Sequence, residues 1–87
     1  MLDFDFIEWD DVNVDHIADN GLSMDEVEDV IRDPGSRQDK SRSSGRPFLH
    51  GETSTGRTII VIYERRKDGR DVIIRPITAY DVLEPTE

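Results

Sequence analysis

Residues 58–63, with the sequence Thr-Ile-Ile-Val-Ile-Tyr, constrain the fold of this chain more than any other segment. Nearly all of these side chains are branched at Cβ, which restricts their rotamers and suits the pleated surface of a sheet. An unbroken run of this kind is typical of a central strand. The sequence therefore predicts a β-sheet with residues 58–63 near its middle.

The segment that follows predicts the partner of this strand. Residues 67–70, Lys-Asp-Gly-Arg, contain an Asp-Gly pair that suits the positive φ angles of a type I′ hairpin turn. Residues 71–76 then return as an antiparallel strand paired with 58–63. Because Pro76 has no backbone N–H, this strand should end there or lie at an edge of the sheet.

Residues 22–35 carry the signals of a helix with both ends marked. Ser23 and Glu26 have the spacing of a capping box, in which each side chain bonds the backbone N–H of the other residue. Pro34 ends the helix, because proline disfavours helical geometry in the residue before it. We therefore expect a helix over residues 24–32.

The N-terminal segment predicts a short strand and an earlier helix. Residues 4–9 alternate in part between apolar and acidic side chains, as a half-buried strand does. Asp10 or Asp11 can cap the following helix by accepting its orphan backbone N–H groups. Asn20-Gly21 ends it, since glycine tolerates the left-handed conformation of a C-cap. The apolar stripe of this helix consists of Val14, Ile17 and Ala18.

Residues 35–46 have no aliphatic or aromatic side chain, so we expect a flexible basic loop there. A further strand follows at residues 47–52. The element order is then β-α-α-β-β-β, an α+β fold with two helices packed on one face of a twisted antiparallel sheet of three or four strands. We expect a single domain over residues 1–80 and an acidic tail over residues 81–87.

Composition excludes several kinds of site. The chain has no cysteine, so it can form neither a disulfide nor a thiolate zinc site. His16 and His50 lie far apart in sequence and form no metal-binding motif, so each is interpreted as structural. No phosphate-binding glycine loop is present, and we expect neither cofactor nor metal. No apolar run reaches the roughly 20 residues of a membrane span, and we expect a cytoplasmic protein.

The net charge of −9 is distributed unevenly. Residues 1–35 hold twelve acidic residues against one basic residue, Arg32, whereas residues 36–80 hold ten basic residues and five acidic ones. Long-range attraction follows the summed field, so the total charge argues against non-specific binding to a polyanion. The local excess of bases still allows one basic face.

Short motifs occur in order over residues 6–80. They are Ile7-Glu8-Trp9-Asp10, Asn20-Gly21-Leu22-Ser23, Asp33-Pro34, Gly56-Arg57-Thr58-Ile59 and Arg75-Pro76-Ile77-Thr78-Ala79-Tyr80. In this order and spacing the chain resembles the BrnT toxins, a branch of the RelE-like superfamily, over nearly its whole length. The resemblance implies a RelE-like fold, RNA as a substrate, metal-independent ribonuclease activity and a small antitoxin-like protein as partner.

Metal-independent RNA cleavage needs a base for the 2′-hydroxyl proton, cations for the phosphate and an acid for the leaving oxygen. RelE-like toxins often build these from arginine, lysine, tyrosine or glutamate. The resemblance therefore implies four candidate catalytic residues, Arg57, Glu64, Arg75 and Tyr80. The bases of the predicted loop are candidate RNA contacts, namely Arg37, Lys40, Arg42 and Arg46. Each of the four catalytic candidates also has a structural interpretation. In it, the two arginines are solvated on the strands or form ion pairs with acidic residues of the helices. Glu64 is then a surface residue at the end of the hairpin, and Tyr80 is an aromatic side chain at the edge of the core.

The chain also departs from the BrnT pattern. Asp19 and Asn20 stand where BrnT toxins usually have lysine and histidine, and Tyr80 stands where they often have arginine. We therefore expect a BrnT-like protein of a toxin–antitoxin system with reduced ribonuclease activity. The alternative is a non-catalytic module that keeps the fold and binds a protein through its sheet or its acidic helices. A third reading, a housekeeping RNA-binding protein, is disfavoured by the net charge.

Overall fold

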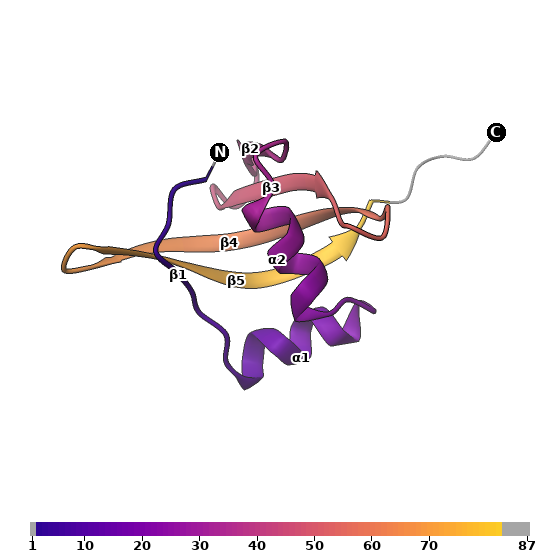
Figure 1. Ribbon diagram of the computed structural model, residues 1–87, viewed down its shortest axis with the longest axis horizontal. Coiled ribbons are helices and arrows are strands. Elements are labelled where there is room, and N and C mark those ends of the chain that lie inside the picture. Colours follow the sequence, from indigo (N-terminus) through magenta and orange to yellow (C-terminus); the bar gives the residue numbers. More distant parts are fainter. Residues whose placement is uncertain (1, 83–87) are drawn as a thin grey trace.

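A computed structural model describes residues 2–82 of the 87-residue chain (Figure 1). Its elements, in chain order, are β1 (Phe6–Ile7), α1 (Asp11–Asp19), α2 (Met24–Arg32), β2 (Arg37–Lys40), β3 (Pro47–Glu52), β4 (Thr58–Asp68) and β5 (Asp71–Asp81). The expected α+β class is confirmed. Neither helix in this part of the chain has the length and apolar character that a bilayer span requires.

All the described strands belong to one five-stranded sheet with the order β1-β5-β4-β3-β2, so β4 is its central strand. Neighbouring strands are antiparallel except β1, which runs parallel to β5. The expectation of an antiparallel sheet of three or four strands is therefore wrong. The two helices between β1 and β2 carry the chain across the sheet, so β1 and the last strand become neighbours. Such long-range backbone pairing leaves no local pattern in the sequence.

Both helices begin where their capping signals predict. Asp10 accepts hydrogen bonds from two backbone N–H groups in the first turn of α1. Ser23 and Glu26 form the predicted capping box of α2, and the helix ends before Pro34. The expected helix over residues 24–32 is confirmed.

The buried face of α1 differs from the predicted stripe. Ile17 is buried, but Ala18 is exposed, and the fully buried neighbour of Ile17 is the polar residue Asn13. The reason is that α1 lies along the free edge of β5, where backbone carbonyls need donors. The Asn13 side-chain amide donates to the carbonyls of Glu8 and Pro76, both at 2.9 Å. A buried amide is thus satisfied where an apolar side chain could not bond the strand.

Residues 35–46, expected as a flexible loop, contain β2. This strand pairs antiparallel with β3 over its whole length, although all of its side chains are exposed. Its approach is held by Ser36, whose buried hydroxyl donates to the carbonyl of Val30 at 2.7 Å. Gly51 of β3 makes room, because a Cβ there would overlap the Ser36 hydroxyl. The loop prediction is wrong for residues 37–40, and the mobility of the segment stays a prediction.

The hairpin of β4 and β5 is longer than predicted. Its strands have 11 residues each and reach the turn, so residues 64–68 pair with 71–75, and 59–63 pair with residues between 76 and 81. The two-residue turn is Gly69-Arg70, with φ 62° at Gly69. Among the described residues positive φ occurs only at glycines, so Arg70 is not left-handed. A positive φ at the first central residue alone matches type II′ rather than the predicted type I′.

β5 does not end at Pro76. The carbonyl of Ile74 accepts the N–H of Glu8 at 2.8 Å on the β1 side, and alternation turns the Pro76 nitrogen to that same side, beyond the end of β1. No neighbouring strand therefore needs the donor that proline lacks. Ile77 then forms a bulge, since it has no partner in the pairing of β4 with β5. The strand does lie at an edge here, as Pro76 requires.

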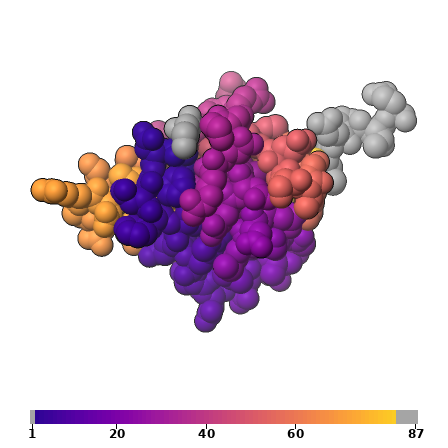
Figure 2. Space-filling model, viewed as in Figure 1, coloured from indigo at the N-terminus to yellow at the C-terminus, as the bar shows by residue number. Residues whose placement is uncertain are grey.

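The helices cover one face of the sheet and leave the other open within residues 2–82. α2 lies across β3 and β4 while α1 packs beside β5, and Figure 2 views this helix-covered side. The core between helices and sheet comprises Ile17, Leu22, Val27, Val30, Ile31, Leu49, Ile59, Val61, Tyr63, Ile74 and Ala79. Ile60 and Ile62 alternate with the buried residues of β4 and are only half-buried on the opposite face. We call that opposite face the open face.

The first two residues of the expected acidic tail, Asp81 and Val82, are bonded to the sheet. Asp81 is the last residue of β5, and the N–H of Val82 donates to the carbonyl of Thr58 at 3.0 Å. The sheet thus anchors the start of this segment. The rest of the expected tail, residues 83–87, lies outside the described residues.

Candidate functional site on the open face

The strand register determines which side chains share the open face. Residues paired across neighbouring strands project from the same face of a sheet. Ile59, Val61 and Tyr63 point into the core, so the alternate residues of β4 and their partners point outward. These outward residues are Phe48 and His50 of β3, Ile60, Ile62 and Glu64 of β4, and Arg75, Thr78 and Tyr80 of β5.

A cavity of about 310 Å³ lies where this face meets α1. We call it the edge cavity, and its lining residues are Val12, Asn13, His16, Arg46, Glu64, Arg75 and Ile77. It brings together two of the predicted catalytic residues, Glu64 and Arg75. It also contains Arg46, which was predicted as an RNA contact, and His16, which was interpreted as structural.

Glu64 and Arg75 stand opposite each other in the pairing of β4 with β5. The Arg75 guanidinium lies 2.8 Å from a carboxylate oxygen of Asp10 and 3.6 Å from one of Glu8. Glu8 also binds Arg66, whose hydrogen bond is the main cause that lowers the pKa of the Glu8 carboxyl. These contacts hold the guanidinium in place, but they also offset its positive charge.

His16 belongs to a row of α1 side chains that bond the carbonyls of β5. Its Nδ1 lies 3.1 Å from the carbonyl oxygen of Ile77, a contact that assigns the proton to Nδ1 and leaves Nε2 as the acceptor of a neutral ring. Asn13 and Asn20 bond β5 carbonyls in the same way. α1 therefore satisfies a strand edge that would otherwise be open to pairing, and the side chain of Asn20 contributes to this contact.

Arg46 is an exposed residue just before β3, and it forms no ion pair with any carboxylate of residues 2–82. Arg37 and Lys40 of β2, and Arg42 in the turn after it, are likewise exposed and form no ion pair in this part of the chain. The predicted RNA contacts thus keep their charges available. Of the four, only Arg46 lines the edge cavity.

Arg57 lies apart from Arg75, in a network at the other end of β5. Its Nε and Nη2 donate to Asp81 at 3.1 and 2.5 Å, and its Nη1 donates to Glu26 at 2.9 Å and to the carbonyl of Gly21 at 3.1 Å. These partners, Asp81 first, raise the pKa of Arg57 above its ordinary value. With its donors engaged, Arg57 ties α2 to both central strands, as the structural reading of this residue described.

Tyr80 is also absent from the edge cavity. It projects from the open face opposite Ile60, with 41% of its surface exposed. Two residues, Thr78 and Ala79, separate it along β5 from Ile77, which lines the cavity. Tyr80 therefore cannot share a substrate atom with Glu64 unless the substrate extends along the sheet.

The sequence analysis missed His16 as a site residue. Nothing in the local pattern indicates that α1 lies against the free edge of β5, because that contact joins residues far apart in sequence. The Asp10 cap does set the phase of the helix, and it places Val12, Asn13 and His16 at the helical spacing that shares one face. The spacing alone does not say what the face contacts.

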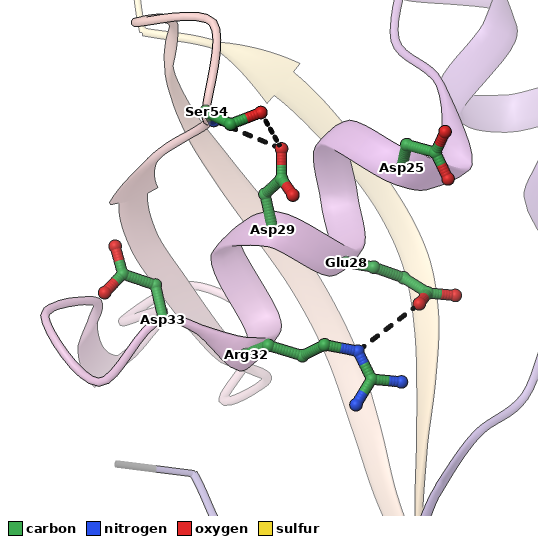
Figure 3. A pocket seen from close by; sticks show the side chains of 6 residues that line it. All are labelled: Asp25, Glu28, Asp29, Arg32, Asp33 and Ser54. Carbon is green, nitrogen blue, oxygen red and sulfur yellow. Dashed lines mark hydrogen bonds and ion pairs between the residues drawn. The ribbon is translucent and has the colours of Figure 1, made fainter.

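A larger cavity, of about 480 Å³, lies on the helix-covered side. Its lining residues are Asp25, Glu28, Asp29, Arg32, Asp33 and Ser54 (Figure 3). Asp29 points to Ser54, whose hydroxyl and backbone N–H lower the pKa of the Asp29 carboxyl, while Asp25 and Asp33 point elsewhere. Within residues 2–82 no group of three or more histidine, cysteine, aspartate or glutamate side chains is placed to hold a metal ion. The excess of carboxylates here repels phosphate.

The edge cavity offers the groups for metal-independent phosphate chemistry, since a carboxylate and an imidazole can exchange protons and two guanidinium groups can stabilise an oxyanion. The larger cavity, lined mainly by carboxylates, offers no comparable set of proton donors and cations.

Comparison with the models of known protein families finds no match to this chain, and comparison with curated proteins finds none either.

Proposed function

We propose that this protein is a BrnT-like toxin-family protein of a toxin–antitoxin system, with a RelE-like fold and a reduced, metal-independent ribonuclease activity. The observation that carries the proposal is the convergence of Glu64, Arg75, Arg46 and His16 on one cavity of the open face. The ordered motifs of the sequence support the same reading.

The proposed reaction is an internal transfer within RNA. The Glu64 carboxylate takes the proton of a 2′-hydroxyl, and the resulting 2′-oxygen bonds to the adjacent phosphorus. The bond from phosphorus to the 5′-oxygen breaks, and that oxygen takes a proton from Nε2 of His16 in its protonated form, while Nδ1 keeps its bond to Ile77. The products are a 2′,3′-cyclic phosphate and a free 5′-hydroxyl. Arg46 and Arg75 stabilise the charge that builds on the phosphate oxygens.

A reduced rate follows from the charge around Arg75. Asp10 and Glu8 already bind its guanidinium, so an incoming phosphate must share it with two carboxylates. Arg46 forms no ion pair within residues 2–82, so it supplies most of the attraction. The site therefore has one well-placed but partly neutralised cation and one available cation.

The partner and the location belong to the same proposal. A small antitoxin-like protein with a basic surface is the partner that suits the acidic helices, which carry most of the twelve acidic residues of the first 35. A cytoplasmic location is proposed because the RNA substrate is found there. Co-purification of the two proteins from cells that express both would test the pairing.

Cleavage of a labelled single-stranded RNA in the presence of a chelator tests the activity. The native protein should release a fragment that ends in a 2′,3′-cyclic phosphate. Glu64→Gln should slow cleavage about 100-fold or more, as loss of a general base does. Asp68→Asn, a matched change in the exposed hairpin, should cleave at the native rate. Absence of cleavage by the native protein, or equal rates for all three, would overturn the proposal.

A second candidate is a non-catalytic interaction module that keeps this fold. The observation that favours it is that carboxylates hold the guanidinium groups of both Arg57 and Arg75. Under this reading the native protein does not cleave RNA but forms a stable complex with a partner protein. The cleavage assay and the co-purification together separate the two candidates.

A further inference from the structure

We propose that a second cavity on the open face binds a nucleobase of single-stranded RNA, an inference that rests on the proposed function and extends it to the substrate. This base cavity has a volume of about 350 Å³. It is lined by Arg37, Gln38, Asp39, Phe48, His50 and Ile60. None of these residues belongs to the edge cavity.

The strand register builds this cavity from one row of side chains. Arg37 of β2 pairs with His50 of β3, His50 pairs with Ile60 of β4, and Ile60 pairs with Tyr80 of β5. Phe48 stands two residues before His50 and projects from the same face. A guanidinium, an imidazole, an aliphatic side chain and the ring of Phe48 therefore line the cavity side by side, and Tyr80 continues the row beyond it.

This combination suits a base and its phosphate better than it suits a protein segment. Bases stack on aromatic rings in single-stranded RNA recognition, and such stacking is independent of sequence. Phe48 and His50 supply rings that are only half-buried, and Ile60, which pairs with His50, places an apolar side chain beside them. Arg37 is free of ion pairs within residues 2–82, so its guanidinium can donate two hydrogen bonds to a phosphate.

A polar side chain of the cavity can read the edge of a base. Asp39 pairs with Phe48 and projects from the same face, so its carboxylate can accept from an exocyclic amino group. Asp39 already accepts the N–H of Lys40 at 2.8 Å, which orients its side chain. A carboxylate beside Arg37 lowers the attraction for phosphate, so stacking rather than charge should dominate binding here.

The two cavities lie along one path. From Ile60 in the base cavity to Glu64 in the edge cavity is four residues of β4, roughly 13 Å at the rise of a strand. Ile62, between them, is half-buried and faces the same side. A short single strand that places one base against Phe48 can therefore place a neighbouring phosphate between Arg46 and Arg75. The base cavity would then set which phosphate is cleaved.

Mononucleotides test this cavity without any cleavable bond. Amide chemical shifts of the native protein are followed during titration with adenosine 5′-monophosphate and, separately, with ribose 5-phosphate. We expect the nucleotide to shift residues 37–39, 48–50 and 60, and to bind about tenfold or more tightly than the sugar phosphate, since the sugar lacks the stacking base. Equal binding of the two compounds, or shifts confined to the edge cavity, would overturn the inference.

Three variants, one of them a control, sharpen the test. Phe48→Leu keeps an apolar side chain without a ring and should weaken nucleotide binding about tenfold, with no change for ribose 5-phosphate. Arg37→Ala should weaken both compounds, whereas Arg70→Ala removes a charge at the hairpin turn that lines neither cavity and should change neither. Unchanged nucleotide binding by Phe48→Leu would contradict the role of the ring.

The result is distinguishable from failure of the proposed function. If nucleotide binds as expected but RNA is not cleaved, the base cavity stands and the ribonuclease proposal falls. If RNA is cleaved in a Glu64-dependent way but nucleotide does not bind in this cavity, the ribonuclease proposal stands and the base cavity falls.

Discussion

The side-chain amide of Asn13 donates a 2.9 Å hydrogen bond to the carbonyl of Pro76, which lies 63 residues further along the chain. The same amide donates to Glu8, and its oxygen accepts the N–H of Asp10 at 2.8 Å. One fully buried side chain thus joins the end of β1, the start of α1 and the free edge of β5. It pairs a carbonyl of β5 that lies beyond the end of β1.

Asn13→Ala should destabilise the fold by roughly 2–4 kcal/mol, because it removes three hydrogen bonds and leaves buried backbone groups unpaired. Asn20→Ala, which removes bonds from an exposed residue to the same strand, should cost about 1 kcal/mol or less. Urea unfolding of both variants measures the difference. Equal losses would show that burial at Asn13 adds nothing to the bond to β5.

The contact between Gly51 and Ser36 gives a second prediction. Gly51→Ala should destabilise the protein by roughly 1–3 kcal/mol, because the new Cβ would overlap the Ser36 hydroxyl where β2 joins β3. Ser36→Ala alone should cost about 1 kcal/mol through loss of the bond to Val30. If the overlap is the cause, the double variant should be more stable than the sum of the two single losses predicts. Strict additivity would contradict that cause.

How far the sequence predicts this fold depends on whether a signal is local. The Ser23 capping box and the β-branched run of β4 are read from a few adjacent residues, and both predictions are confirmed. The sequence did not predict β2, because this strand is held by backbone pairing and by one serine and has no apolar side chain that would indicate a strand. The sequence did not predict the parallel pairing of β1 with β5 either, because this pairing joins opposite ends of the chain.

The residues of the candidate site can likewise be separated into those positioned by local signals and those positioned by contacts between distant parts of the chain. The approach of Glu64 to Arg75 depends on the hairpin register, which a local turn sets, although the sequence analysis paired the strands differently. The placement of Arg57 could not be predicted, because its partners Glu26 and Asp81 lie in α2 and at the end of β5. Nor could the sequence predict that His16 would reach the same cavity from α1.

Acidification should destabilise the protein through Glu8 and Asp29, whose carboxyl pKa values are lowered below the ordinary 4.5 and 3.8. A lowered folded-state pKa contributes stability above the ordinary value, and this stability is lost as the pH falls through the folded-state pKa. The hydroxyl of Ser54 is the largest cause at Asp29. Ser54→Ala should therefore be less stable than the native protein at neutral pH and should lose less on acidification.

The measurement is the urea midpoint of native protein and variant from about pH 7 down to about pH 3, a range over which the difference between the two curves should shrink. Ser43→Ala, in the exposed turn after β2, is the matched control and should follow the native curve. A constant difference between Ser54→Ala and the native protein at all pH values would show that the hydroxyl acts independently of the Asp29 charge.

The contrast between Arg46 and Arg57 yields a prediction about salt. Binding of single-stranded RNA by the native protein should weaken linearly with the logarithm of salt concentration, because each phosphate contact releases counterions. Arg46→Ala should reduce the magnitude of this slope by about 1, as loss of one contact does. Arg57→Ala should leave the slope unchanged and instead lower the unfolding temperature, because its guanidinium binds Asp81 and Glu26 rather than a ligand.

Fluorescence anisotropy of a labelled RNA at several salt concentrations measures the slopes, with Arg70→Ala as a matched loss of charge at the hairpin turn, far along the strands from the edge cavity. Arg70→Ala should bind with the native slope if phosphates are bound only at the open-face cavities. A reduced slope for Arg57→Ala with a native slope for Arg46→Ala would place RNA at the opposite end of β5. That result would remove the edge cavity from the binding path, because Arg46 and Arg57 lie in separate clusters that a single phosphate cannot contact together.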